Sequence, residues 1–276
     1  PQIILTTNTI SEISSSLKFN GSNQQVNLGD ITVIEDLAGL SIAFWVKFED
    51  LSGNMTILSK GDFTIGIAPG ANELYVQKLN TNSFRSFWNG AITGSSALSI
   101  NTWYHVAVVL NSGNVPYIYV NGDLKGSAGQ SMNGNSVSSS DNVIIGGGSE
   151  YYFKGKFDEL AFWKTDLNSS NVKALYNSGL IMDFRSNSGN YNSSDNLVGY
   201  WKFNERSGST TADSSANNNN GTITSASWSD ASPSSKITEI NYSSGSSTTT
   251  HSFIYTIAAG DTTADLDYTS TSALEL

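Results

Sequence analysis

Acidic side chains at two places in the chain have types and spacings that suit metal binding or hydrolysis. The segment FDEL contains Asp158 and Glu159 side by side, and the loop-like segment AGDTTADLD contains Asp261, Asp265 and Asp267. Ca²⁺ takes about six to eight oxygen ligands from such carboxylates and from carbonyl groups. A strand directs neighbouring side chains to opposite faces, so Asp158 and Glu159 are predicted to point away from each other. The pair therefore does not predict two carboxylates facing one cleft.

The sequence offers little for nucleophilic or acid–base catalysis. It contains two histidines, His105 and His251, and no cysteine, which excludes disulfides and thiolate chemistry. His105 lies inside an apolar strand pattern, where a histidine is typically a hydrogen-bonded residue of the core or of a cleft wall. We therefore predict that the protein is not an enzyme.

Aromatic residues in turn-rich stretches form a candidate sugar-binding platform. Sugars dock on exposed aromatic rings beside a few polar groups, and the residues that fit this description are Arg85, Trp88, Tyr151 and Tyr152. The alternative is that these aromatic rings cover an edge of the folded sheets. Other tryptophans lie within strand patterns and are expected in the core: Trp45, Trp103, Trp163 and Trp201.

The charge balance excludes several classes of partner. The chain has 24 acidic and 14 basic residues, a formal net charge of −10, and no basic run. Phosphate neutralisation requires clustered Lys and Arg, so no nucleic-acid partner is predicted, and an anionic membrane surface is disfavoured for the same reason. No apolar run reaches the roughly 18 residues that a membrane-spanning helix needs, so membrane insertion is not predicted.

Short strand patterns recur along the chain and predict an all-β protein. In NTWYHVAVVL (101–110) both alternating sets of side chains are largely apolar, which is typical of a central strand in a packed sandwich. The dipeptide Asn121-Gly122 predicts a type I′ hairpin, because both residues accept positive φ. Residues 17–29 are expected to form a second strand pair around their own Asn-Gly turn.

One segment has a helical pattern. Residues 166–179 place Val172, Leu175 and Tyr176 on one apolar stripe. Asn168 can cap the start of this helix, and Gly179 is expected to end it. The chain is therefore predicted to be all-β with a single short helix.

Seven motifs occur in a fixed order: LKFNG, SIAFWVKF, ILSKG, NTWYHVAVV, IYVNGDLKGSA, FKGKFDELAFW and VKALYNSG. This order resembles the laminin G-like, concanavalin A-like domains of bacterial, marine and phage surface proteins. The resemblance implies a two-sheet antiparallel jelly-roll sandwich over residues 11–232. Some glucanases share this fold and carry an E-x-D-x-E strand, which this sequence lacks. Related domains often bind Ca²⁺, for which Asp158 and the turn at Asn20 are the candidates; alternatively, Asp158 hydrogen-bonds backbone groups.

The two ends of the chain resemble a second family. PQIILTT (1–7) and the segment from SSGSSTTT to the final SALEL (243–276) are similar to parts of a bacterial Ig-like repeat of very large extracellular proteins. The resemblance implies that residues 1–10 and 233–276 form a partial Ig-like β-sandwich into which the jelly roll is inserted. The alternative is a linker followed by the start of another domain. The AGDTTADLD loop is similar to loops that bind Ca²⁺ between tandem domains.

These resemblances imply a non-catalytic binding or adhesion module of a large extracellular protein, on a cell surface or a virion surface. The expected ligand is a glycan or a surface protein, neighbouring domains of the same long chain are further partners, and calcium is the candidate cofactor. The alternative is a structural spacer or decoration domain, in a fibre or on a capsid, with protein neighbours only. A divergent glycosidase is a third hypothesis, which an open cleft with two carboxyl groups would favour.

Overall fold

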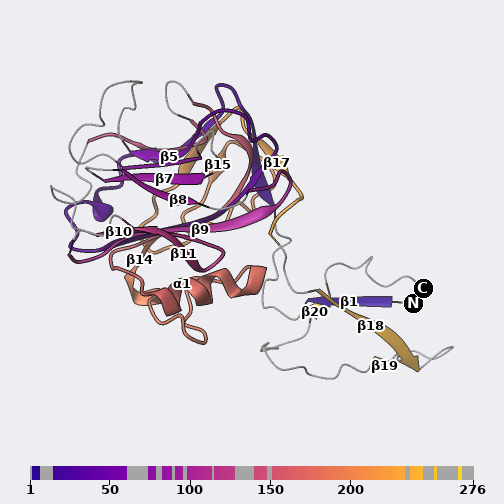
Figure 1. The fold of residues 1–276 in the computed structure, drawn as a ribbon. Coiled ribbons are helices and arrows are strands. Elements are labelled where there is room, and N and C mark those ends of the chain that lie inside the picture. Colours follow the sequence, from indigo (N-terminus) through magenta and orange to yellow (C-terminus); the bar gives the residue numbers. More distant parts are fainter. Residues whose placement is uncertain are drawn as a thin grey trace. The chain divides into compact units, whose positions relative to one another are not determined.

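The computed structural model describes residues 2–6, 15–60, 74–78, 83–88, 91–95, 98–113, 115–127, 140–147, 151–233, 237–244, 252–253 and 267–268. The chain divides into two compact units (Figure 1). The larger unit is Ser15–Pro233, and the smaller unit combines Pro1–Ser14 with Ser234–Leu276.

The larger unit contains two antiparallel sheets. Sheet I has the order β11-β10-β9-β4-β13-β2-β17, with β14 also paired to β13. Its strands are Asp123–Ser127 (β11), Pro116–Val120 (β10), Trp103–Leu110 (β9), Leu40–Phe48 (β4), Lys154–Trp163 (β13), Ser16–Asn20 (β2), Ser227–Ser229 (β17) and Leu197–Trp201 (β14).

Sheet II has the order β15-β16-β3-β12-β5-β6-β7-β8. Its strands are Thr210–Thr211 (β15), Gly221–Thr224 (β16), Gln25–Asn27 (β3), Val143–Ile145 (β12), Met55–Lys60 (β5), Leu74–Lys78 (β6), Ser83–Trp88 (β7) and Ala91–Ser95 (β8). Short 3₁₀ turns occur at Thr32–Ile34, Asn177–Gly179 and Ser194–Asn196. The two sheets form the expected jelly-roll sandwich.

The central strand β9 separates two apolar clusters. Every second residue from Tyr104 to Leu110 enters the main core, whereas Ala107 and Val109 belong to a cluster on the outer face of sheet I. This alternation follows from the period of two along a strand. The prediction that β9 is buried on both faces is confirmed.

Helix α1 (Ser169–Tyr176) covers part of the outer face of sheet I, the side turned away from sheet II (Figure 1). The Asn168 side chain accepts the backbone N–H of Asn171 at 2.9 Å, which confirms the predicted N-cap. The helix ends before the predicted Gly179, because Asn177 already adopts the left-handed conformation with φ 46° that terminates helices.

The two Asn-Gly turns have different outcomes. Asn121 and Gly122 have φ of 53° and 77° and join β10 directly to β11, as predicted for a type I′ hairpin. The prediction of a strand pair over residues 17–29 is wrong, because β2 and β3 belong to different sheets. β2 lies between β13 and β17, and β3 lies between β12 and β16, so both edges of each strand pair with distant segments.

The smaller unit is described by its backbone pairing. β1 (Gln2–Thr6) pairs antiparallel with β18 (Ile237–Ser244), and β19 (Ser252–Phe253) and β20 (Asp267–Tyr268) complete the order β19-β18-β1-β20. Strands from both ends of the chain therefore share one sheet, while the likeness of these segments to an Ig-like domain stays a prediction. Within the described parts of both units, no helix has the length and apolar character needed to cross a bilayer.

Candidate functional site

The carboxyl pair on β13 lies at a β-bulge. The register between β13 and β4 shifts between Asp158 and Ala161, and Glu159 has φ 53°. Phe157 and Leu160 both enter the main core, so the two residues between them are displaced together to the outer face of sheet I. A bulge inserts one extra residue and interrupts the alternation of side chains. The prediction that Asp158 and Glu159 point to opposite faces is wrong for this reason.

Asp158 is in an environment that favours its neutral form. The side chain is fully buried, Oδ1 accepts the backbone N–H of Glu159 at 3.0 Å, and Oδ2 has no hydrogen-bond partner among the described residues. Burial raises the pKa of Asp158 well above its usual value, and the neighbouring Glu159 charge raises it further. The hydrogen bond from the Glu159 backbone opposes this rise only in part.

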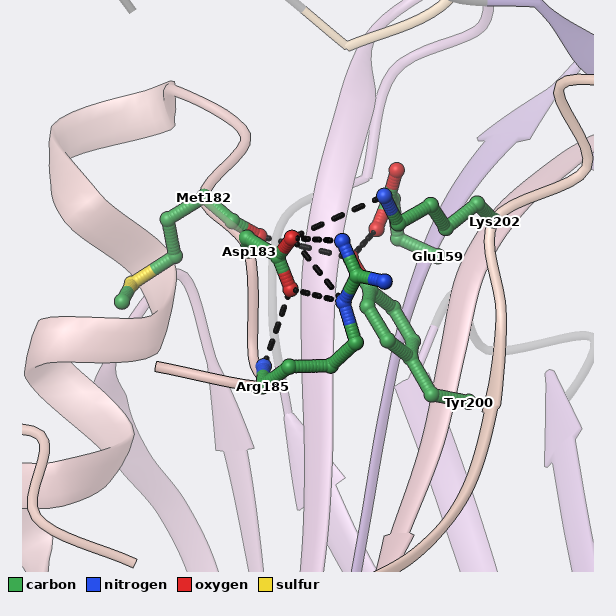
Figure 2. A network of polar contacts seen from close by, with 6 residues as sticks. All are labelled: Glu159, Met182, Asp183, Arg185, Tyr200 and Lys202. Atoms are coloured by element: carbon green, nitrogen blue, oxygen red, sulfur yellow. Dashed lines mark hydrogen bonds and ion pairs between the residues drawn. The ribbon is translucent and has the colours of Figure 1, made fainter. Parts of the chain in front are cut away.

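Glu159 belongs to a polar network that reaches the surface (Figure 2). The buried Tyr200 hydroxyl donates to Glu159 Oε2, and burial followed by the Glu159 charge raises the pKa of Tyr200 well above its usual value. Nearby, Asp183 Oδ1 accepts a hydrogen bond from Arg185 Nε at 2.9 Å, and Asp183 Oδ2 lies 3.6 Å from Lys202 Nζ. These contacts connect the segment before β14 to the bulge in β13. We interpret the network as holding these two segments in position.

His105 is buried in the same cross-strand row as Asp158, with Trp45 between them. Its imidazole is fully buried, with Trp45 and Tyr176 ring centroids at 5.3 Å and 6.3 Å. Neither ring nitrogen has a hydrogen-bond partner among the described residues, so the expected hydrogen bond is not found there. Burial lowers the pKa of His105 to about 3, which keeps the ring neutral at ordinary pH. His251 lies outside the described residues.

The structure does not bring together the two residues expected to share a calcium site in the jelly roll. Asn20 ends β2 and pairs with Lys154, whereas Asp158 lies further along β13 and pairs with Trp45. The exposed Asn20 Oδ1 accepts the backbone N–H and the hydroxyl of Ser22. Asn20 therefore stabilises its own turn.

The acidic cluster near the C-terminus falls largely outside the described residues. Asp261 and Asp265 are not among them, and Asp267 is described only as the first backbone position of β20. Across the described ranges, no group of three or more His, Cys, Asp or Glu residues has an arrangement that could hold a metal ion. Calcium binding stays a prediction.

The predicted sugar platform is divided between β7 of sheet II and the segment just before β13. Arg85 and Trp88 are three residues apart in β7, so the two positions belong to opposite faces of the strand. Arg85 pairs with Gln77, and Gln77 pairs with Thr56. The backbone N–H of Thr56 donates to the Tyr151 carbonyl at 2.7 Å. Position 85, Gln77 and Thr56 thus form one row across three strands, and the backbone of Tyr151 lies at the end of this row. Position 88 is on the opposite face of β7 and does not belong to the row.

Tyr152 is held in place by a close backbone approach. A Cβ atom at Gly147 would lie 2.6 Å from Tyr152 Cδ1, so the tyrosine ring needs a glycine at this position. Tyr151 and Tyr152 are both partly exposed. The two tyrosines are therefore partly accessible next to β5, and the ring of Tyr152 is packed against Gly147.

Residues 20–173 match the concanavalin A-like lectin/glucanases superfamily, over more than half of the 276-residue chain. The chain belongs to this superfamily. No curated protein sequence matches it. Membership of the superfamily explains the two-sheet architecture, but it covers both lectins and glucanases and so leaves binding and hydrolysis open.

Solved structures show the same fold. The chain is similar to a candidate carbohydrate-binding protein from Bacteroides ovatus, with a TM-score of 0.60 and 19% identity over 80% of this chain and 61% of that one. It is also similar to the CBM40 of the Ruminococcus gnavus IT-sialidase, with a TM-score of 0.50 and 15% identity over 60% of this chain and 99% of that one. The chain thus spans about three fifths of the length of the Bacteroides protein.

A row of lysines on sheet I was not predicted from the sequence. Lys47 pairs with Lys156, and Lys156 pairs with Lys18. These three residues form the lysine row, and Trp103, which pairs with Lys47, ends it. Trp103 was expected in the core but is only partly buried. The lysines lie far apart in the sequence, so only the strand register reveals them as neighbours.

Proposed function

We propose that the jelly roll is a non-catalytic glycan-binding module. Its superfamily is named for lectins and glucanases, and the two similar solved structures carry carbohydrate binding or a CBM40 in their names. The burial of the carboxyl pair on β13 favours binding over hydrolysis. Glycosidase carboxyls flank a bond of the bound sugar, whereas Asp158 and Glu159 are 0% and 1% exposed.

The tyrosine surface beside β5 is the proposed contact with neutral sugar rings. Tyr151 and Tyr152 are partly exposed residues, and aromatic faces stack on sugars while nearby polar groups set orientation. Position 85 lies in one cross-strand row with Gln77 and Thr56, whose side chains are buried and hydrogen-bonded to each other, so these two are not part of the proposed contact. Arg85 and Trp88 stay predictions as sugar contacts, because the structure describes only the backbone of β7.

We further propose that the module belongs to a larger extracellular protein of a cell or virion surface, where it contributes to adhesion. Antiparallel pairing of β1 with β18 supports insertion of the jelly roll into a domain built from both chain ends. An insertion is tolerated where the two ends of the guest lie close together. Neighbouring domains of the same long chain are then its constant partners, and calcium remains a proposed cofactor.

A glycan array probed with the full chain tests this function, once with Ca²⁺ and once with a chelator. We expect binding to at least one glycan class. Tyr152→Ala should weaken binding to neutral glycans, while the matched Tyr152→Phe variant, which keeps the ring, should retain it. Absence of binding under both conditions would contradict the proposal and favour the spacer alternative.

A further inference from the structure

The lysine row concentrates positive charge on an acidic protein. Residues paired directly across two strands share one face, with Cβ atoms about 4.5–5.5 Å apart. Lys47, Lys156 and Lys18 therefore project side by side from three adjacent strands, whereas the whole chain has only 14 basic residues and a net charge of −10. Like charges placed opposite each other destabilise a sheet. Charge balance within the fold does not explain this arrangement.

The next cross-strand row on this face of sheet I is covered by α1, whereas the lysine row is not. Two residues away from Trp103, Lys47 and Lys156, on strands β9, β4 and β13, lie His105, Trp45 and Asp158, all of them buried. Tyr176 of α1 packs over Trp45 and His105. The lysine row, in contrast, is partly exposed throughout, and the Lys18 side chain is 44% accessible. The lysine row is thus part of the outer face of sheet I that α1 leaves open.

Few acidic groups neutralise the lysine row. Lys18 Nζ lies 3.2 Å from Glu49 Oε1, which offsets one of the three charges. Lys47 and Lys156 make no salt bridge with any residue that the structure describes. Burial lowers the pKa of Lys47, the adjacent Lys156 lowers it further, and Glu49 raises it. Glu49 is therefore shared between Lys18 and Lys47, so the three ammonium groups of the row outnumber the carboxylate beside them.

Trp103 adds an apolar boundary to the row. Lys47 Nζ lies 5.1 Å from the centroid of the Trp103 ring, a cation–π contact that orients the ammonium. Successive strands are about 4.8 Å apart, so the three lysines span about 10 Å across the sheet. Ammonium groups act as compact point charges with several donors, which suits separate carboxylate or sulfate groups along a chain.

We propose that the lysine row and Trp103 bind an acidic polysaccharide, a sugar chain carrying carboxylate or sulfate groups. The proposal rests on the proposed function in that the ligand is a glycan, but it assigns a surface on sheet I that is separate from the tyrosines beside β5. The repulsion between the neighbouring lysines would then be reduced when the anionic chain binds.

Binding of the full chain to heparin (sulfated), polygalacturonate (carboxylated) and dextran (neutral) tests the proposal by titration calorimetry over a salt series. The test variant is Lys18→Gln/Lys47→Gln/Lys156→Gln. The control variant, Lys125→Gln/Lys164→Gln/Lys173→Gln, removes the same charge elsewhere. We expect wild-type binding to an acidic polymer in preference to dextran, weakened by salt. The test variant should bind at least about tenfold more weakly, about 1.4 kcal/mol, and the control variant within about twofold of wild type.

The outcomes separate this proposal from the proposed function. Equal affinity of the test variant and wild type, or binding to dextran alone, would overturn the lysine row as a site and leave glycan binding standing. Absence of binding to every glycan would overturn both. Binding to vesicles of anionic lipid with none to polysaccharide would assign the row to a lipid surface and overturn the proposal. A thermal melt of the test variant at or above the wild-type midpoint would show that the fold is intact.

Discussion

Replacement of Asp158 by asparagine should reverse a cost that the protein bears at neutral pH. Burial, followed by the Glu159 charge, raises the pKa of Asp158 in the folded state above its unfolded value near 3.8. A raised carboxyl pKa contributes stability below the unfolded pKa, and that contribution is lost as the pH rises toward the folded pKa. The asparagine side chain in Asp158→Asn would keep the acceptor for the Glu159 N–H, which Asp158 Oδ1 now provides at 3.0 Å, but would carry no titratable proton.

The size of the effect follows from proton linkage. Each pH unit between the unfolded and folded pKa changes the free energy of unfolding by about 1.4 kcal/mol. The difference in unfolding free energy, Asp158→Asn minus wild type, should therefore rise with pH above about pH 4, by up to about 1.4 kcal/mol per pH unit, until the pH passes the folded pKa of Asp158. A buried amide N–H₂ without a partner adds a penalty of about 1–3 kcal/mol, but this penalty is the same at every pH.

Urea denaturation of both proteins at several pH values measures this difference directly. Asp213→Asn is the matched control, because the Asp213 carboxylate accepts backbone N–H groups from Tyr200, Ser215 and Asn219. Its replacement should lower the free energy of unfolding by about 1–3 kcal/mol at pH 7. A variant-minus-wild-type difference for Asp158→Asn that stays constant with pH would refute the reasoning about its burial.

Three further substitutions test other parts of the fold. The folded pKa of His105, about 3, lies below its unfolded value of 6.5, so its stabilising contribution is lost as the pH falls between these values. Urea titrations of His105→Phe should show a smaller acid loss, by up to about 5 kcal/mol. Asn168→Ala should cost about 1 kcal/mol in thermal unfolding, and Asn168→Ser less, because the cap to Asn171 would be kept. Gly146→Ala should cost at least about 2 kcal/mol by calorimetry, because its Cβ would lie 2.3 Å from Phe19 at φ 94°.

Local sequence signals predict those features that depend on a few adjacent residues. The Asn121-Gly122 hairpin requires only two positive φ angles, and the cap at Asn168 requires only the next turn of backbone. The alternation along Trp103–Leu110 is likewise contained within one strand. Each of these predictions is confirmed because its cause lies within a short segment.

Features that depend on the register between strands far apart in the sequence cannot be predicted from local sequence signals. The bulge at Glu159 depends on how β13 meets β4, and no turn residue in FDEL marks it. The helix stop at Asn177 precedes the more obvious Gly179 because asparagine also tolerates the left-handed conformation. Lys18, Lys47 and Lys156 become one row only through strand pairing. Period-two patterns alone could have placed each lysine on a face, but not beside the others.

Glycan binding without cleavage can be tested most directly in one measurement. The full chain is incubated with an array of neutral and acidic glycans, with Ca²⁺ and with a chelator, and both retained protein and released reducing ends are quantified. We expect retention on at least one glycan class and no released product, because Asp158 and Glu159 are buried. Absence of retention under both conditions, or product release that Asp158→Asn or Glu159→Gln abolishes, would contradict a non-catalytic glycan-binding module.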